Sequence, residues 1–180
     1  MKEKVKTIII MFAAYFILAI PFKVMNVIPG FTDVRPVTMF GPIYALAFGI
    51  PGCAVFAICN LIMDIISDSL RWSSIAGLLS NFAGPYLIFY YYKRISREGL
   101  KLKRAAKIVE YVVILILAAL IEAIMITPSV RYAYPDVDWK VFMISVILNT
   151  SIFPIIFGIP LIILLQEELG FKMKAIRQDT

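Results

Sequence analysis

Polar side chains suited to binding a solute interrupt the most apolar segments of this chain. The stretch CNLIMDIISD carries Asn60, Asp64 and Asp68 at every fourth position, which predicts that they share one face of a helix. An ionised carboxylate that faced lipid would cost several kcal/mol. We therefore expect Asp64 to face protein or water.

Three further apolar segments carry Asn81, Glu122 and Asn149, each at a depth similar to that of Asp64 if the segments cross a membrane. One interpretation is structural: amide and carboxyl groups hydrogen-bond across helices, at about 0.6 kcal/mol per contact. The other is functional: the groups line a cavity that opens to the outside and holds a polar solute. The shared depth favours the second interpretation.

Three loops expected on the outer side add matching chemistry. GFTDVRP (30–36), SDSLRWSS (67–74) and PSVRYAYPDVDW (128–139) combine charged and aromatic residues, as small-molecule pockets do. The predicted substrate-binding residues are Arg35, Asn60, Asp64, Trp72, Asn81, Glu122 and Asn149.

Composition determines which elements must position these groups. Of the 180 residues, 61% are hydrophobic, against about 45–50% in soluble domains. With about 20 residues needed per spanning helix, the chain has room for about six spans. We predict an all-α integral membrane protein, a single domain over 1–180 built as a six-transmembrane-helix bundle, whose first helix is a retained span. The predicted spans are 7–28, 38–49, 52–67, 74–92, 107–126 and 140–165.

The distribution of Lys and Arg predicts the orientation of the bundle. Thirteen of them lie before the first span, between the fourth and fifth, or after the sixth, and five lie on the opposite side. Positive charge is enriched in cytoplasmic loops, so both termini are expected in the cytoplasm of a multi-pass cell-membrane protein. Topology and anionic lipid headgroups account for the net charge of +6, and no nucleic acid is needed to explain it.

A short, broken hairpin is predicted where FGIPG (48–52) separates the second span from the third. Gly41, Ala45 and Gly49 are spaced by four along the second span, and small residues at this spacing let another helix approach closely. The stripe is either packed inside this chain or a docking face for a partner membrane protein.

The sequence offers little for catalysis. It has no histidine and two cysteines in apolar surroundings, and no motif for a metal or a cofactor is present, so none is expected. A membrane enzyme acting on a lipid or headgroup, with Asp64 and Glu122 as an acid/base pair, is one alternative to solute binding. A non-transporting membrane subunit or sensor is another. We predict no catalytic residue.

Two stretches resemble a known family. DVRPVTMFGPIYALAFGIPGCAVFAICNLIMDII (33–66) and GLLSNFAGPYLIFYYYKR (77–94) are similar to the substrate-binding S component of energy-coupling factor (ECF) vitamin transporters. The resemblance implies a vitamin-like solute bound in the outer half of the bundle, under a lid formed by 30–36. It also implies two kinds of partner, a transmembrane T subunit and two cytoplasmic ATPases, as in an ABC-type transporter.

Overall fold

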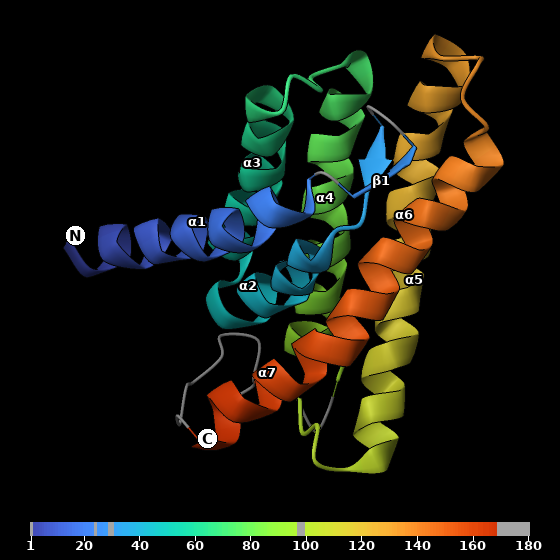
Figure 1. The fold of residues 1–180 in the computed structure, drawn as a ribbon. Helices are drawn as coiled ribbons and strands as arrows, with labels where there is room; N and C mark the ends of the chain where they lie inside the picture. Colours follow the sequence, from blue (N-terminus) through green and yellow to red (C-terminus); the bar gives the residue numbers. More distant parts are fainter. Residues whose placement is uncertain (1, 24, 29–30, 97–99, 169–180) are drawn as a thin grey trace.

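The computed structural model describes residues 2–23, 25–28, 31–96 and 100–168, and this part of the chain is all-α apart from one short hairpin (Figure 1). The elements, in chain order, are α1 (Lys2–Phe22), β1 (Asn26–Ile28), β2 (Thr32–Asp33), the 3-10 helix η1 (Pro36–Met39), α2 (Phe40–Phe48), α3 (Ile50–Ile66), α4 (Trp72–Tyr90), the π-helical turn η2 (Tyr91–Ile95), α5 (Ala105–Ala133), α6 (Trp139–Phe153), the π-helical turn η3 (Pro154–Gly158), α7 (Ile159–Ile163) and the π-helical turn η4 (Leu164–Glu168).

The first helix ends earlier than predicted. A span to residue 28 is wrong, because α1 stops at Phe22 and residues 26–28 form β1, antiparallel to β2. Pro21 lies in the last turn, where it lacks an N–H and its ring crowds the preceding turn. The β-branched Val27 and Ile28 suit a strand, and pairing with β2 satisfies backbone groups that a continued helix would otherwise use.

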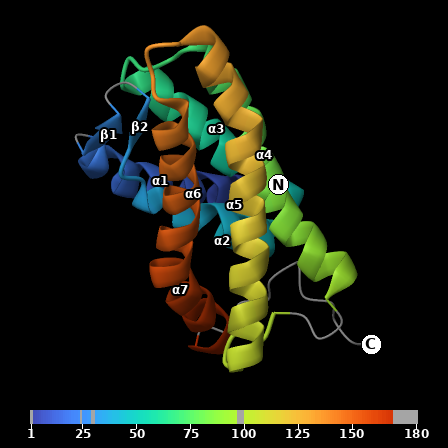
Figure 2. The ribbon, with the colours of Figure 1, turned by 90° about the vertical axis from the view of Figure 1, so that its right-hand side faces the viewer.

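Helix α1 also lies across the bundle. Figures 1 and 2 show it running crosswise to α4 and α5, which stand side by side. It packs through a single stripe of buried residues spaced by four, Met11, Tyr15 and Ala19. The Tyr44 hydroxyl donates to the Met11 carbonyl at 2.7 Å and fixes this crossing.

The broken hairpin between α2 and α3 forms as predicted. Gly49 ends α2 with a φ of +70°, a conformation that side chains other than glycine rarely adopt. Pro51 follows in the first turn of α3, where its missing N–H has no cost. Gly52 then lets the two helices touch, because a Cβ at this position would overlap the carbonyl oxygen of Tyr44.

The fifth helix continues beyond its predicted end at 126. The predicted span ends just before Pro128, but α5 runs to Ala133 with the proline inside. The continued turn places Val130 in the core with 0% exposure, so tertiary packing outweighs the local cost of the proline. The helix thereby reaches the same end of the bundle as the α3–α4 loop (Figure 1).

The sixth predicted span corresponds to an almost continuous helical path from Trp139 to Glu168. Asp138 caps its start by accepting from the backbone N–H of Lys140 at 2.9 Å. The α-helical pattern gives way at Pro154 to η3 and resumes at Ile159. The sequence FGIP, found at 48–51, occurs again at 157–160, at this change of helical pitch.

Three helical segments of the described chain are long and apolar enough to cross a membrane: Val5–Phe22, Ala105–Ala133 and Trp139–Gln166. Their outer faces expose aliphatic side chains, among them Ile17 at 75% and Ile124 at 65%. Such a surface suits lipid rather than water, and it indicates a membrane protein. The predicted cytoplasmic charges Lys172, Lys174 and Arg177 lie outside the described residues.

Candidate functional site

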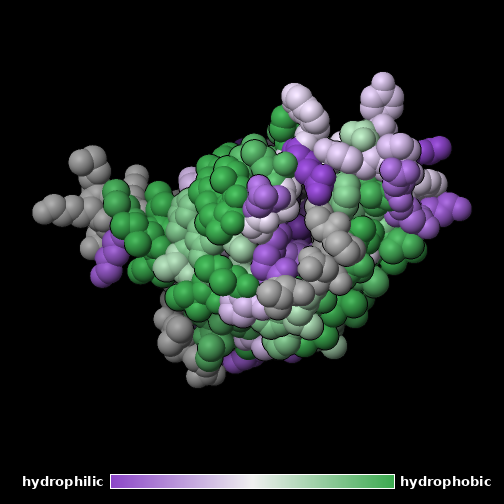
Figure 3. All heavy atoms as spheres, turned by 45° about the horizontal axis from the view of Figure 1, so that its top comes forward, coloured by the Kyte–Doolittle hydropathy of each residue, from purple (hydrophilic) through white to green (hydrophobic). Residues whose placement is uncertain are grey.

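One end of the bundle encloses a polar cavity of about 260 Å³. Figure 3 looks onto this end and shows hydrophilic side chains gathered around a hollow between apolar surfaces. The cavity is lined by Lys23, Phe31, Asp33, Arg35, Asn60, Asp64, Ser67, Asp68, Ser69, Arg71, Ser73, Ser74, Gly77, Asn81, Ile126 and Phe142. We call it the main cavity.

The structure brings most of the predicted site residues together. Arg35, Asn60, Asp64 and Asn81 line the main cavity. Glu122 and Asn149 line a smaller neighbouring cavity of about 50 Å³, which shares Arg35 and Asn81 with the first. Trp72 lines neither and is 78% exposed, because it begins α4 on the outer surface of the bundle.

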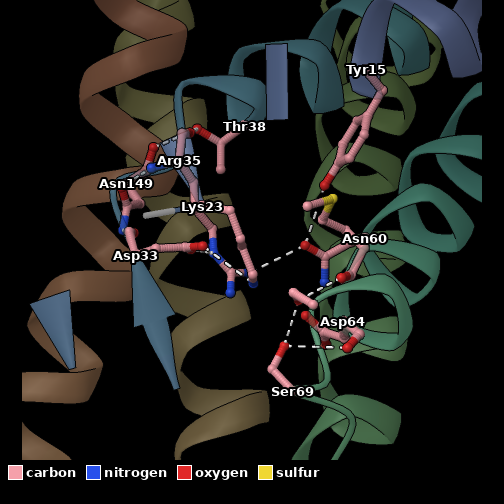
Figure 4. A network of polar contacts seen from close by, with 11 residues as sticks. Tyr15, Lys23, Asp33, Arg35, Thr38, Asn60, Asp64, Ser69 and Asn149 are labelled. Carbon is pink, nitrogen blue, oxygen red and sulfur yellow. Dashed lines mark hydrogen bonds and ion pairs between the residues drawn. The ribbon is translucent and has the colours of Figure 1, made fainter. Parts of the chain in front are cut away.

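Asp33 is the centre of an ion-pair network (Figure 4). Its carboxylate accepts from Lys23 Nζ at 3.2 Å and from Arg35 Nε. Asp33 is 4% exposed, so both cations neutralise a carboxylate that would be costly to bury alone. Burial lowers the pKa of Arg35, but the carboxylates of Asp33 and Asp64 more than offset this, and the pKa lies above its usual value.

Asn60 orients this arginine from the opposite side. Its Oδ1 accepts from Arg35 Nη1 at 3.1 Å and from the Tyr15 hydroxyl at 3.4 Å. Tyr15 is 1% exposed and belongs to α1, so the crosswise helix contributes to the site. The guanidinium is therefore fixed between β2 and α3.

Asn149 acts on the backbone rather than on the main cavity. Its Oδ1 accepts from the Arg35 N–H at 3.0 Å, and its Nδ2 donates to the Asp33 carbonyl at 2.9 Å. Thr38 Oγ1 donates to the Asn149 carbonyl at 2.6 Å. These three bonds attach the segment from β2 to η1 to helix α6, and they place Asp33 and Arg35 at the cavity wall.

Asp64 is a buried carboxylate of the main cavity that has no bonded partner among the described residues. It is 9% exposed, and its side chain makes no hydrogen bond or ion pair with any described residue. Its backbone carbonyl accepts from the Ser69 N–H at 2.8 Å, which closes the end of α3. Asp68 is not on the predicted helical face, because α3 ends at Ile66 and Asp68 adopts a φ of +52°, yet it also lines the cavity.

The three predicted outer loops meet at the mouth of the main cavity. The Arg71 guanidinium lies 4.7 Å from the ring centroid of Phe31 and 5.6 Å from that of Tyr134. The two rings pack edge to face at 4.9 Å. Arg131 instead stacks on Trp139 at 5.0 Å and lines neither cavity.

Sequence reasoning did not assign Tyr15, Lys23 or the loop serines to the site. Lys23 had a signal, since it is a cation directly after an apolar helix that ends near the polar loop 30–36. Tyr15 had none, because an aromatic residue in an apolar helix is most often core. Only the crossing of α1 over α3 brings its hydroxyl to Asn60.

The small-residue stripe of the second span is covered by the chain's own helices. Gly41 is buried against Phe56 of α3 and Pro85 of α4, and Ala45 is 0% exposed. Gly49 is buried against the ring of Phe89. This arrangement corresponds to the intramolecular alternative for the stripe.

Comparisons of the chain with protein-family models, curated proteins and solved structures find no match. Within the described residues, no group of three or more His, Cys, Asp or Glu side chains is placed to hold a metal ion. The chemistry of the site must therefore be read from the cavity itself, which is lined by fixed cations, by the carboxylates of Asp64 and Asp68, and by four serines.

Proposed function

We propose that this protein is the membrane-embedded, substrate-binding subunit of an uptake system for a small, vitamin-like micronutrient. The observation that carries the proposal is a charge-lined cavity of about 260 Å³ at one end of an apolar helical bundle. Small-molecule sites combine apolar walls with a few precisely placed polar groups. In this proposal the solute enters from outside the cell, and a separate T subunit and two ATPases supply the energy.

The chemistry of the wall narrows the class of solute. Lys23 and Arg35 already share the carboxylate of Asp33, whereas Asp64 has no partner among the described side chains. A buried carboxylate is stabilised by a charged or N–H donor partner. The solute is therefore expected to present a cationic nitrogen or an N–H group to Asp64, with the hydroxyls of Ser67 and Ser69 beside it.

The mouth supplies a route for entry. Phe31 precedes β2 and lies beneath the Arg71 guanidinium, so these two side chains must separate to admit a solute. Cation–π contacts at exposed sites are worth about 0.5–1 kcal/mol. The proposed lid is 30–36, of which the structure describes 31–36, and Asn149 fixes its far end.

The proposed topology is six spans with both termini in the cytoplasm of a cell-membrane protein. In the present arrangement α1 and α5 run crosswise, so no single bilayer normal follows both (Figures 1 and 2). The topology therefore requires α1 to turn relative to α3. It contacts the bundle through one stripe only, which makes α1 the helix best able to do so.

Native mass spectrometry of the protein purified from its own membranes tests the proposal by identifying a retained compound. That compound should bind wild type at a ratio of about one to one. Asp64→Asn should weaken binding by at least about tenfold, because a charge-assisted hydrogen bond is lost. Its stability should fall only slightly, since Asp64 makes no hydrogen bond or ion pair with a described side chain and only its longer-range attraction to Arg35 is lost.

Asp136→Asn is the matched control, because Asp136 is an exposed acid in the α5–α6 loop. It should bind as wild type does. Equal binding by Asp64→Asn and Asp136→Asn would contradict the assigned site. Turnover of a lipid by the protein alone would favour an enzyme instead, although Asp64 and Glu122 line different cavities. Co-purification with a single non-ATPase partner would favour a sensor.

A further inference from the structure

The smaller cavity beside the main one differs from it in size and lining. Its volume is about 50 Å³, and it lies between α4, α5, α6 and η1. A cavity of this kind needs about 10–15 Å³ to hold one water, so this one takes only a few water-sized guests and excludes a vitamin-sized solute. Its lining residues are Phe31, Arg35, Thr38, Ser80, Asn81, Glu122, Ile126, Phe142, Val146, Asn149 and Thr150.

Glu122 is the acidic group of this cavity. Its side chain belongs to α5 and is only 7% exposed. It lies against Gly84 of α4, and a Cβ added there would overlap Glu122 Oε1, so the missing side chain makes room for the carboxylate. Among the described residues the carboxylate accepts no hydrogen bond and forms no ion pair.

The neighbouring hydroxyl groups do not donate to Glu122 because their protons are engaged elsewhere. Thr38 Oγ1 donates to the Asn149 carbonyl at 2.6 Å. Ser80 Oγ donates to the Gly77 carbonyl at 3.0 Å, and Thr150 Oγ1 donates to the Val146 carbonyl at 2.8 Å. A hydroxyl has one proton and two lone pairs, so each of these oxygens has only acceptor capacity left.

We infer that this cavity binds a small monovalent cation of the sodium type, held by the Glu122 carboxylate and by hydroxyl oxygens of Thr38, Ser80 and Thr150. The guanidinium of Arg35 also lines the cavity, but its bonds go to Asp33 and Asn60. The buried Glu122 carboxylate, beside hydroxyl oxygens that can only accept, would be stabilised by a positively charged guest. Hard cations prefer oxygen ligands, and a single carboxylate neutralises a single charge. The cavity is small enough for an ion, and the oxygen atoms of its wall are suitable ligands for a hard cation.

The cation would also affect the main cavity. Arg35 and Asn81 line both cavities, so a charge placed beside Glu122 acts on residues that face the solute. This coupling rests on the proposed function, but cation binding by itself does not. The two are therefore tested separately, and the cation is tested with no solute present.

The direct measurement is the thermal unfolding of the purified protein in sodium, potassium or choline chloride at equal ionic strength. A cation that binds only the folded state raises the midpoint of unfolding with its concentration. The unfolding midpoint of wild type should be higher in sodium chloride than in choline chloride. Binding of radioactive sodium to the protein should reach saturation. Equal midpoints in all three salts, with no bound sodium, would overturn the inference.

Glu122→Gln distinguishes a carboxylate that binds a cation from a buried carboxylate that binds nothing. The amide removes the charge and brings N–H donors to the surrounding acceptors, so this variant should be more stable than wild type without sodium and should no longer respond to it. Glu110→Gln is the matched control on the same helix, where Glu110 pairs with Lys107 outside the cavity. It should keep the sodium response.

Thr150→Val provides a second, nearly isosteric test, which removes one oxygen and keeps the shape. It should weaken sodium binding by at least about tenfold, the usual scale for losing a group that supports a cation. A retained sodium response in both Glu122→Gln and Thr150→Val would overturn the inference. A midpoint that responds to pH through Glu122 and not to sodium would also overturn it, because the guest would then be a proton.

Discussion

The two ends of the bundle are held together in different ways, and α3 belongs to both. Its first half packs against α2 and α4, where Ala45, Leu46, Cys53 and Cys59 are all 0% exposed. Its second half carries Asn60 and Asp64 into a hollow. Close packing of apolar side chains holds the packed end together, whereas directional bonds to charged groups hold the hollow end together.

This difference shows why equal burial does not imply an equal role. Asp33 and Glu122 are 4% and 7% exposed, so both carboxylates are buried. Asp33 is matched by two cations of the protein, whereas Glu122 has no partner among the described residues. The first organises the site, and the second leaves a position open for a guest.

Gly52→Ala should produce the largest effect, because it breaks the packed end. The new Cβ would overlap the Tyr44 carbonyl, which is backbone and cannot swing away. We expect a loss of about 3 kcal/mol or more in the free energy of unfolding, seen as a lower unfolding midpoint. Gly77→Ala is the control, since its Cβ would meet only Ile126 Cδ1 at 3.4 Å. An equal loss in both variants would refute this account.

Asp33→Asn should have an intermediate effect, because it breaks the hollow end. Lys23 and Arg35 lose their shared carboxylate while remaining partly buried, with side-chain exposures of 22% and 23%. We expect a loss of about 1–3 kcal/mol in stability together with loss of solute binding. Both are measurable on one preparation, by unfolding and by titration with the retained compound. Unchanged binding would show that Arg35 is positioned without Asp33.

Trp72→Phe should have the smallest effect on stability and solute binding, and it tests whether Trp72 belongs to the site. The sequence places Trp72 among the solute-binding residues, but the side chain is 78% exposed and lines neither cavity. Surface substitutions of this kind usually change stability by less than about 0.5 kcal/mol. Solute binding should match that of wild type in the same titration. A clear loss would place Trp72 at the cavity mouth in the bound state.

The helices could be predicted because their signals are local. Apolar runs located a helix at each of the six predicted segments, and FGIPG located the α2–α3 break through the demands of one glycine and one proline. The end of α5 could not be predicted, because Pro128 argues locally for a stop and only the burial of Val130 explains why the helix continues.

The site was predictable in its residue types but not in its pairings. Unusual polar residues in apolar segments identified Asn60, Asp64 and Glu122. The role of Asn149 was hidden, because its partners Arg35 and Asp33 lie 114 and 116 positions away. Such long-range bonds leave no periodic signal, so an amide that positions backbone looks the same in sequence as one that contacts a solute.

The attachment of Asn149 has a mechanical consequence. One amide binds the backbone on both sides of Val34, and the same residue's carbonyl receives Thr38. Any sliding or rotation of α6 must then move the backbone that carries Arg35. Under the proposed function, a partner subunit that pushes on α6 from outside the cavity would loosen the bound solute without contacting the residues that line the cavity.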